Sequence, residues 1–298
     1  MDGILPLWKE KGFTSHDCVS KARGMLRTKK IGHTGTLDPD VEGVLPLCIG
    51  KATKIVPFLT DTEKVYEAEV TVGRSTETED ASGAIIEKEV VNKCPSILEI
   101  KDILQRFKGE VTQIPPMYSA VKVKGKRLYQ YARDGEEVER PVRRVHIKEI
   151  GLNEDSVTFT NEELLFKLNV TCSKGTYIRT LCVDIGKALG FPAHMSSLIR
   201  LETGGIDREK CFTFEQVQEL VDKGSAMDAI LPISVGLTHL NDFPINNDER
   251  FVFEHGQVLP KPPNVTNDPF VVKCKGEVIA IYQQHPSKPD KIKPIRVF

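Results

Sequence analysis

Alternation of apolar and polar residues predicts two half-buried β-strands. In residues 66–72 the side chains of Tyr66, alanine and valine alternate with glutamate and threonine. In residues 164–172 leucine, phenylalanine, valine and cysteine fill every second position. Successive side chains of a strand point to opposite faces, so each segment buries one face. The short apolar run at residues 44–49 indicates a buried strand or the start of a helix.

Three further segments begin with the capping-box pattern, in which a hydroxyl residue is followed three positions later by Asp, Glu or Gln. Apolar residues at helical spacing follow the first two of these signals, and each of the three predicts a helix start. A fourth helix is predicted for residues 178–189, with Gly190 as the left-handed residue that ends it. The three signals are Thr14 with Asp17, Ser96 with Glu99, and Thr213 with Gln216.

The composition of the chain changes after residue 235. Proline and asparagine become frequent there, between short β-like segments such as 270–274 and 277–282. This pattern predicts a domain at residues 1–235 and a small β-rich module at residues 240–298. Strands and helices mix without a regular βαβ alternation, which favours an α+β fold over a doubly wound sheet.

The composition excludes several classes of protein. The 298 residues contain 41 basic and 42 acidic side chains, and no run approaches the length of a membrane span, about 18 apolar residues. The first twelve residues lack the layout of a signal peptide. The seven cysteines form no C-x-x-C pair, and no His/Cys cluster has zinc-ligand spacing. We therefore expect a cytoplasmic protein with reduced thiols, no membrane association, no metal and no cofactor.

The charged residues are unevenly distributed along the chain, although the net charge is only −1. Residues 117–133 contain five basic residues and no acidic one, interleaved with three tyrosines, whereas residues 61–99 contain ten acidic and four basic residues. Basic stretches with interleaved aromatic residues suit a phosphate backbone and unstacked bases. The alternative is an ordinary solvated surface with flexible lysines, and charge alone leaves both interpretations open.

Asp38 is the first candidate for chemistry. It lies in a stretch rich in Gly, Thr and Pro at residues 32–43, and the following Pro39 disfavours a helical backbone at Asp38. A carboxylate on a stiff, non-helical loop is placed like a catalytic group. The alternative is a turn in which Asp38 bonds only its own backbone, as Asp commonly does. The nearby Gly50–Thr53 segment is not a phosphate loop, because Leu45 and Ala52 occupy positions that need Gly and a hydroxyl residue.

The second candidate segment is 172–179, CSKGTYIR. A predicted strand ends there, Gly175 permits a tight turn, and a helix begins with Lys174 beside its N-terminus, an arrangement that favours an anion. Arg179 lies at the edge of the buried helical stripe. There it either reaches a site or covers the apolar core with its stem.

Long motifs in this chain resemble those of the bacterial tRNA pseudouridine-55 synthases of the TruB type. The matching segments run from about Gly3 to Gly205. The last 60 residues or so resemble the family's PUA-type RNA-binding module more weakly. The resemblance implies an α+β pseudouridine-synthase fold with a mixed, mainly antiparallel central sheet flanked by helices. It also implies an RNA-clasping insertion at about residues 110–140. The motifs are GHTGTLDPDVEGVLPLCIGKATK, YEAEVTVG, TETEDASG, KGEVTQIPPMYSAVKVKGKRLYQYARDG and CSKGTYIRTL.

The resemblance also assigns roles to single residues. It makes Asp38 the catalytic aspartate, Tyr66 the tyrosine that stacks on the target uracil, and Arg179 the partner of the aspartate. The remaining matches are substrate-binding positions: His33, which fills the space vacated by the flipped base, and Lys64, Tyr177, Leu201 and Lys9. One departure is visible, because the family's Lys-Pro-x-Gly pattern reads Lys9-Glu10-Lys11-Gly12 here.

The expected reaction is the isomerisation of a uridine in the T-stem-loop of tRNA to pseudouridine, by a monomer without an obligate protein partner. A carboxylate can assist this reaction as a nucleophile, and a guanidinium partner keeps it ionised in a water-poor pocket. Two alternatives remain. One is a guide-RNA-dependent pseudouridylase subunit of the dyskerin type, which the lack of long charged extensions disfavours. The other is a non-catalytic RNA-binding or RNA-folding protein.

Overall fold

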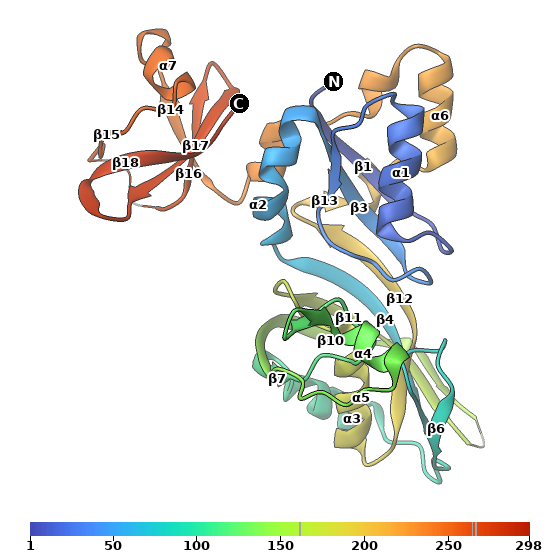
Figure 1. Ribbon diagram of the computed structural model, residues 1–298. Helices are drawn as coiled ribbons and strands as arrows, with labels where there is room; N and C mark the ends of the chain where they lie inside the picture. The colour runs from blue at the N-terminus through green and yellow to red at the C-terminus, as the bar shows by residue number, and fades with distance from the viewer. Residues whose placement is uncertain (161, 264, 266) are drawn as a thin grey trace. The chain divides into compact units, whose positions relative to one another are not determined.

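The computed structural model describes residues 1–160, 162–263, 265 and 267–298. Its backbone contacts group the chain into two compact units (Figure 1). Unit 1 comprises Met1–Asp40, Val44–Thr62 and Thr203–Phe298, and unit 2 comprises Val41–Gly43 and Glu63–Glu202. Among the described residues, every helix is too short or too polar to traverse a lipid bilayer.

The first part of unit 1 is built on β1 and β3, whose residues are almost all buried. The short strand β2 pairs antiparallel with the end of β3, and β1 bonds at Trp8 to the backbone of Phe212. Continuous apolar runs form these strands because both of their faces are covered. The elements are β1 (Gly3–Lys9), α1 (Ser15–Met25), β2 (Ile31–His33), β3 (Glu42–Ile49), α2 (Val56–Thr60), β13 (Ile206–Asp207), α6 (Phe214–Asp222) and the 3₁₀ helices η1 (Gly50–Ile55), η2 (Arg208–Lys210), η3 (Ala226–Ala229) and η4 (Ile233–Leu237).

The C-terminal part of unit 1, residues 241–297, has a sheet and an apolar core of its own. Its strands follow the order β14-β16-β17-β18-β15, with β14 parallel to β16 and the other described pairs antiparallel. The ring of Tyr282 packs edge-on against Phe253 in this core. The elements are β14 (Asn241–Ile245), α7 (Asn247–Glu254), β15 (Leu259–Pro260), β16 (Phe270–Cys274), β17 (Glu277–His285) and β18 (Lys288–Val297).

Unit 2 is built on a mixed, mainly antiparallel sheet in the order β12-β4-β11-β10-β7. The pairs β4–β11, β11–β10 and β10–β7 are antiparallel, and Glu42–Gly43 pairs in parallel with Ile199–Arg200 of β12. The elements are β4 (Lys64–Val72), β5 (Arg74–Thr76), β6 (Ile85–Lys88), α3 (Ile97–Gln105), β7 (Gly109–Gln113), β8 (Lys122–Val123), β9 (Lys126–Arg127), α4 (Leu128–Asp134), β10 (Arg143–Phe159), β11 (Leu164–Cys172), α5 (Ile178–Leu189) and β12 (Ala193–Thr203).

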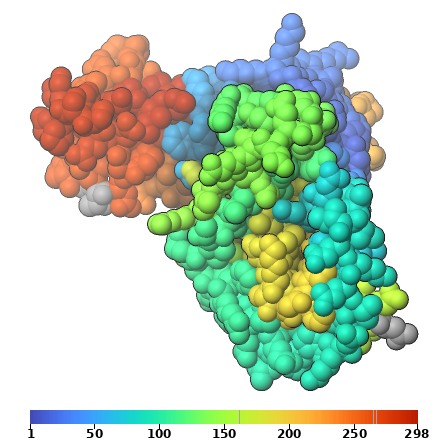
Figure 2. All heavy atoms as spheres, turned by 60° about the horizontal axis from the view of Figure 1, so that its bottom comes forward, coloured from blue at the N-terminus to red at the C-terminus, as the bar shows by residue number. Residues whose placement is uncertain are grey.

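Helices α3 and α5 contact each other, and they lie against β10 and β4 respectively. In Figure 2 the yellow atoms of the α5 segment lie between the cyan atoms of the β5–β6 hairpin and the blue-green atoms of α3. The insertion between β7 and β10 contains the β8–β9 hairpin and α4. Its hairpin continues directly into α4, and these elements bear Lys122, Lys126, Arg127 and Arg133.

The α+β fold class predicted from the sequence is confirmed, with its mixed, mainly antiparallel sheet and β-rich C-terminal part. The capping boxes at Thr14, Ser96 and Thr213 are all present, and Gly190 ends α5 in the left-handed conformation. The predicted domain division at residues 235–240 stays a prediction.

Candidate functional site

Asp38 lies in the loop between β2 and β3 of unit 1 and is partly exposed. Strand β2 ends at His33, which pairs with Leu47, and Thr34 then donates to the carbonyl of Pro46 from a fully buried position. Gly35 has a positive φ of 146°, and Leu37 turns its side chain into the core. The loop is therefore anchored at its start and in its middle by buried residues.

The residue before Asp38 is fixed by a serine of α1. The hydroxyl of Ser15 accepts a hydrogen bond from the Leu37 N–H (2.8 Å) and donates one to the Leu37 carbonyl (3.3 Å). Ser15 is 2% exposed and Leu37 is 4% exposed, so both bonds are shielded from water. A short hydroxyl side chain thereby holds the backbone on the N-terminal side of Asp38 at two points.

The residue after Asp38 is fixed by the segment that follows β1. The Lys9 Nζ, on a fully buried side chain, donates to the carbonyls of Pro39 and Glu10 (3.1 Å each). The Gly12 N–H donates to the same Pro39 carbonyl (2.9 Å). Glu10, which replaces the proline of the family pattern, thus contributes its backbone carbonyl to this cluster. The Asp38 backbone is held from both sides.

Three candidate residues of unit 2 lie on the neighbouring strands β4 and β12 of its sheet. On β4, Tyr66 pairs with Val170 and Lys64 pairs with Cys172 of β11. Tyr66 is half-buried, whereas Lys64 is 6% exposed. Leu201, near the end of β12, is also half-buried. The alternation in the sequence predicted that Tyr66 lies on the buried face of β4. In the structure its side chain remains partly accessible.

Arg179 is held by hydrogen bonds to two distant segments of unit 2. Its Nη1 donates to the Thr78 carbonyl (3.0 Å) and to Asp80 Oδ2 (3.2 Å), and its Nη2 donates to the Tyr118 carbonyl (2.9 Å). The residue is only 7% exposed. The sequence placed Arg179 at the edge of the helical stripe, and the structure shows a guanidinium with specific acceptors.

Asp80 is kept ionised by its surroundings. Burial alone would raise its pKa, but hydrogen bonds from the Ser82 and Thr78 side chains and from the Ser82 N–H outweigh that effect, and Arg179 adds an attractive charge. The pKa of Asp80 consequently lies below its ordinary value. This ordered carboxylate orients one side of the Arg179 guanidinium.

Glu79, the next residue in the chain, behaves in the opposite way. Burial raises the pKa of its carboxyl, although a hydrogen bond from the Thr180 hydroxyl (2.7 Å) and the Arg179 charge oppose the shift. Its backbone is left-handed, with a φ of 63°. The turn at residues 78–80 therefore contacts both Arg179 and the residue that follows it.

Tyr177, the N-cap residue of α5, is held through its backbone. The Tyr177 N–H donates to Gln113 Oε1 (3.0 Å), and the Gln113 Nε2 donates to the Tyr177 carbonyl (3.1 Å). The Tyr177 side chain makes no capping bond to the helix. The glutamine at the end of β7 thus fixes the start of the helix that bears Arg179.

The outer part of the insertion combines basic and aromatic side chains. The guanidinium groups of Arg127 and Arg133 lie 5.8 Å and 5.4 Å from the Tyr129 ring centre, and the Lys126 ammonium lies 4.6 Å from that of Tyr131. These contacts hold cations and rings together on β9 and α4. Such a surface suits a nucleic acid more closely than scattered lysines do.

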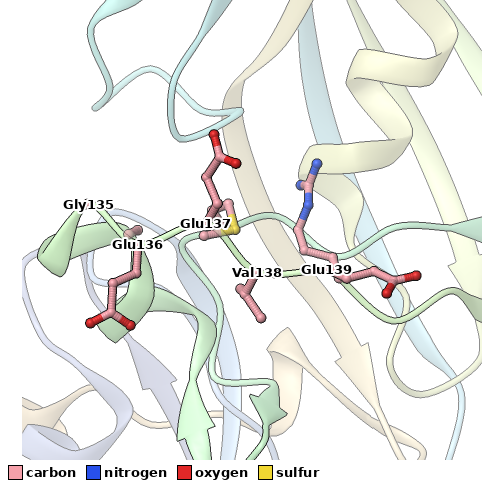
Figure 3. Close-up of a pocket in the computed structure, with 8 residues that line it drawn as sticks. Gly135, Glu136, Glu137, Val138 and Glu139 are labelled. Carbon is pink, nitrogen blue, oxygen red and sulfur yellow. The ribbon is translucent and has the colours of Figure 1, made fainter.

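A pocket of about 590 Å³ also lies in the insertion, but its polar side chains do not converge on a common point. The carboxylates of Glu136, Glu137 and Glu139 point in different directions (Figure 3). None of the residues predicted as site residues lines it. Among the described residues, His, Cys, Asp and Glu side chains form no cluster of three or more suited to a metal ion.

The structure divides the predicted site residues between the two units. Lys9, His33 and Asp38 belong to unit 1, and Lys64, Tyr66, Tyr177, Arg179 and Leu201 belong to unit 2. Within unit 2, sequence reasoning missed Asp80, Gln113 and Tyr118 as partners of the Tyr177–Arg179 segment. Asp80 carries a signal of a turn, since Asp side chains commonly bond the backbone two residues on, as Asp80 does with the Ser82 N–H. Gln113 and Tyr118 carry no such signal.

Two family models match the sequence. The model described as the TruB family pseudouridylate synthase (N terminal domain) matches residues 23–178, which is more than half of the chain. The chain belongs to the TruB family of pseudouridylate synthases. The model described as the tRNA pseudouridylate synthase B C-terminal domain matches residues 179–238. The family assignment made from the motifs is therefore confirmed.

Relatives of similar length extend this match over the whole chain. The tRNA pseudouridine synthase B of Oceanobacillus iheyensis is 56% identical over 300 residues, covering 100% of this chain and 98% of the relative. That of Halalkalibacterium halodurans is 50% identical over 299 residues, covering 99% and 96%. This TruB-family chain thus aligns from end to end with proteins of that name.

Solved structures show the same fold. A crystal structure of a Cbf5-Nop10-Gar1 complex contains a chain 27% identical to this one, with a TM-score of 0.72, covering 99% of this chain and 83% of that chain. An H/ACA RNP bound to a substrate RNA containing 2′-deoxyuridine gives a TM-score of 0.74 at 24% identity, covering 99% and 84%, and shows the likeness of fold.

Proposed function

We propose that this TruB-family protein converts uridine 55, in the T-loop of tRNA, to pseudouridine. It acts as a monomer on the T-stem-loop, in the cytoplasm and without a guide RNA or protein partner. The proposal is supported by relatives at 50–56% identity that are named tRNA pseudouridine synthase B. The observation that carries it is the Asp38 loop, whose backbone is held on both sides by the buried Ser15 and Lys9.

The reaction needs a well-placed carboxylate but no net change in atoms. The bond between the ribose C1′ and uracil N1 breaks, the base rotates, and a bond forms between C1′ and C5. C5 loses its proton, and N1 gains one. An aspartate promotes bond cleavage by attacking the sugar or the base as a nucleophile, or by stabilising the positive charge that develops on the sugar. Asp38 takes this role in our proposal.

Restricting the Asp38 backbone matters because the carboxylate must meet a single atom of the substrate. Misplacement of a catalytic group by about 1 Å can lower a rate about a hundredfold. The bonds to Leu37 and Pro39 reduce the freedom of the residue between them. A turn that only satisfied its own backbone would not need two buried side chains from other elements.

Arg179 is the proposed partner of Asp38. A guanidinium favours the ionised form of a carboxylate in a water-poor pocket and fixes its orientation. The bonds that Arg179 makes to Asp80, Thr78 and Tyr118 support this role, because they order its guanidinium before substrate arrives. Asp80 acts through Arg179 in this scheme and is a positioning residue.

The target base must leave the stack of the folded T-loop before it can react. Stacking of a base on an aromatic side chain contributes about 1–3 kcal/mol, and the half-buried Tyr66 ring is our candidate for that contact. His33 fills the vacated space in the RNA. Lys9, Lys64, Tyr177 and Leu201 complete the proposed substrate-binding set.

Two further surfaces are proposed to contact the RNA. The insertion, about residues 110–140, offers the cation and tyrosine pairs around Tyr129 and Tyr131. The PUA-like module at residues 240–298 is the second, following the catalytic domain at residues 1–235. Its final 29 residues contain six basic and two acidic side chains.

The test is to incubate the purified protein alone with an unmodified tRNA transcript and to map pseudouridine along it. We expect one pseudouridine, at position 55, and none in a transcript with cytidine at that position. Turnover only after a guide RNA or a second protein is added would support a dyskerin-type subunit. Tight binding without turnover would support a non-catalytic RNA-binding protein.

A further inference from the structure

Gln113 is a buried polar residue whose whole side chain is committed to one other residue. It ends strand β7 and is 1% exposed. Its amide oxygen accepts from the Tyr177 N–H (3.0 Å), and its amide nitrogen donates to the Tyr177 carbonyl (3.1 Å). The side-chain amide therefore bonds both backbone groups of Tyr177, in the way that one strand bonds its neighbour in a sheet. Gln113 and Tyr177 are 64 positions apart in the sequence.

This contact fixes the backbone of the residue at which α5 begins. Tyr177 is the N-cap residue, with an extended backbone (φ −95°, ψ 104°) and no side-chain capping bond. Its carbonyl also accepts the first helical bond, from the Leu181 N–H. The orientation of the first helical turn, which bears Arg179, therefore depends on how Gln113 holds Tyr177.

A second contact reaches the guanidinium itself from the same segment. Five positions after Gln113, the Tyr118 carbonyl accepts from Arg179 Nη2 (2.9 Å), and the Tyr118 hydroxyl donates to Glu77 (2.8 Å). Gln113 and Tyr118 bracket the first residues of the insertion. The segment 113–118 thus contacts both the backbone before Arg179 and its charged end.

We propose that Gln113 is a positioning residue for Arg179, and that segment 113–118 connects the RNA-contacting insertion to the helix that carries this arginine. The inference rests on the proposed function, in which Arg179 serves the reaction. Gln113 is buried and holds only the backbone of Tyr177, so its loss lowers the rate of the chemical step far more than it lowers tRNA affinity.

Two substitutions of nearly equal size separate positioning from packing. Gln113→Met removes both hydrogen bonds. Gln113→Glu keeps an acceptor for the Tyr177 N–H but places a second oxygen against the Tyr177 carbonyl, and only a protonated Glu donates to that carbonyl. The measured quantities are the single-turnover rate at saturating tRNA, the tRNA dissociation constant, and hydrogen exchange at the Tyr177 amide.

We expect both variants to lose about tenfold to a hundredfold in rate, with dissociation constants within about twofold of wild type. The rate of Gln113→Glu, relative to wild type at each pH, should recover as the pH is lowered, whereas that of Gln113→Met should stay flat. The Tyr177 amide should exchange faster in Gln113→Met. A role in packing alone would leave Gln113→Met, which has nearly the same size, at the wild-type rate.

The matched control is Val145→Ala, which makes a cavity next to β7 without touching Tyr177. Val145 is 4% exposed and pairs with Val111 of β7. Val145→Ala should lower the melting temperature while keeping the wild-type rate. A wild-type rate in Gln113→Met, or an equal loss of rate in Val145→Ala, would overturn the inference. If wild type itself forms no pseudouridine, the proposed function fails, and unchanged Tyr177 exchange in Gln113→Met would still overturn the positioning role.

Discussion

The replacement Ser15→Ala tests whether the Asp38 loop depends on its buried anchor. The substitution removes one hydroxyl and with it both bonds to Leu37, at 2.8 Å and 3.3 Å. No larger group enters, so nothing else in the core has to move. The Leu37 N–H loses its acceptor at a position where Ser15 is 2% exposed and Leu37 is 4% exposed.

The expected cost follows from that unsatisfied donor. Leaving a buried N–H without a partner costs about 1–3 kcal/mol. Loss of the longer bond to the Leu37 carbonyl adds little to this cost. The higher helix propensity of alanine offsets the cost by about 0.5 kcal/mol. We therefore expect urea denaturation to show an unfolding free energy about 0.5–2.5 kcal/mol lower than that of wild type. Because Asp38 follows Leu37, the single-turnover rate should fall about tenfold or more.

Ser20→Ala is the matched control, since Ser20 is an exposed residue of the same helix. It should leave both the unfolding free energy and the rate close to wild type. A Ser15→Ala variant with wild-type stability and rate would refute the reasoning. A variant that is destabilised but reacts at the full rate would show that the anchor serves the fold and not Asp38.

Further predictions concern the Arg179 network, the unit 2 sheet and RNA binding. The pKa of Asp80 is lowered on folding, so its ionised form stabilises the protein above the unfolded pKa of about 3.9. The stability advantage of wild type over Asp80→Asn should disappear in acid denaturation series as the pH falls through the folded pKa. Gly43→Ala should lower the unfolding free energy by about 1–3 kcal/mol, because its Cβ would lie 2.3 Å from the Arg200 carbonyl oxygen and its φ is 131°. Replacing Lys122 and Lys124 by Gln should reduce the salt dependence of tRNA binding by about one unit of slope per lysine, and an unchanged slope would remove this hairpin from the interface.

Local signals in the sequence predicted the helix starts well. Thr14 receives the Asp17 N–H on its side chain, and Asp17 returns the bond to the Thr14 N–H, as the capping box requires. The strand at residues 164–172 was predicted with its observed ends. These features depend on residues no more than four positions apart, so one sequence is enough to find them.

Strands without a steady period were missed. In β10 the pairing with β11 shifts between Ile147 and Glu149, so the buried positions change phase after Ile147. Such a bulge destroys the alternation by which a strand is recognised. In β1 all seven residues are buried, and a continuous apolar run carries no period at all.

The candidate site shows the same division between local and distant information. The sequence indicated a stiff loop at Asp38, because Pro39 restricts the residue before it. It did not predict that Ser15 would hold Leu37, 22 positions away, or that Arg179 would bond Tyr118 from 61 positions away. These contacts arise from the packing of separate elements, and no short-range pattern encodes them.

The central claim is that the Asp38 carboxylate carries the reaction, and the comparison of Asp38→Asn with Asp40→Asn tests it most directly. Asp40 is exposed on the same loop and provides the same change of charge. The measurement is single-turnover pseudouridine formation on a tRNA transcript, with the dissociation constant measured in parallel. The account predicts no detectable product from Asp38→Asn at wild-type affinity within a few fold, and a near wild-type rate from Asp40→Asn. Pseudouridine formed by Asp38→Asn at a rate close to wild type would contradict it.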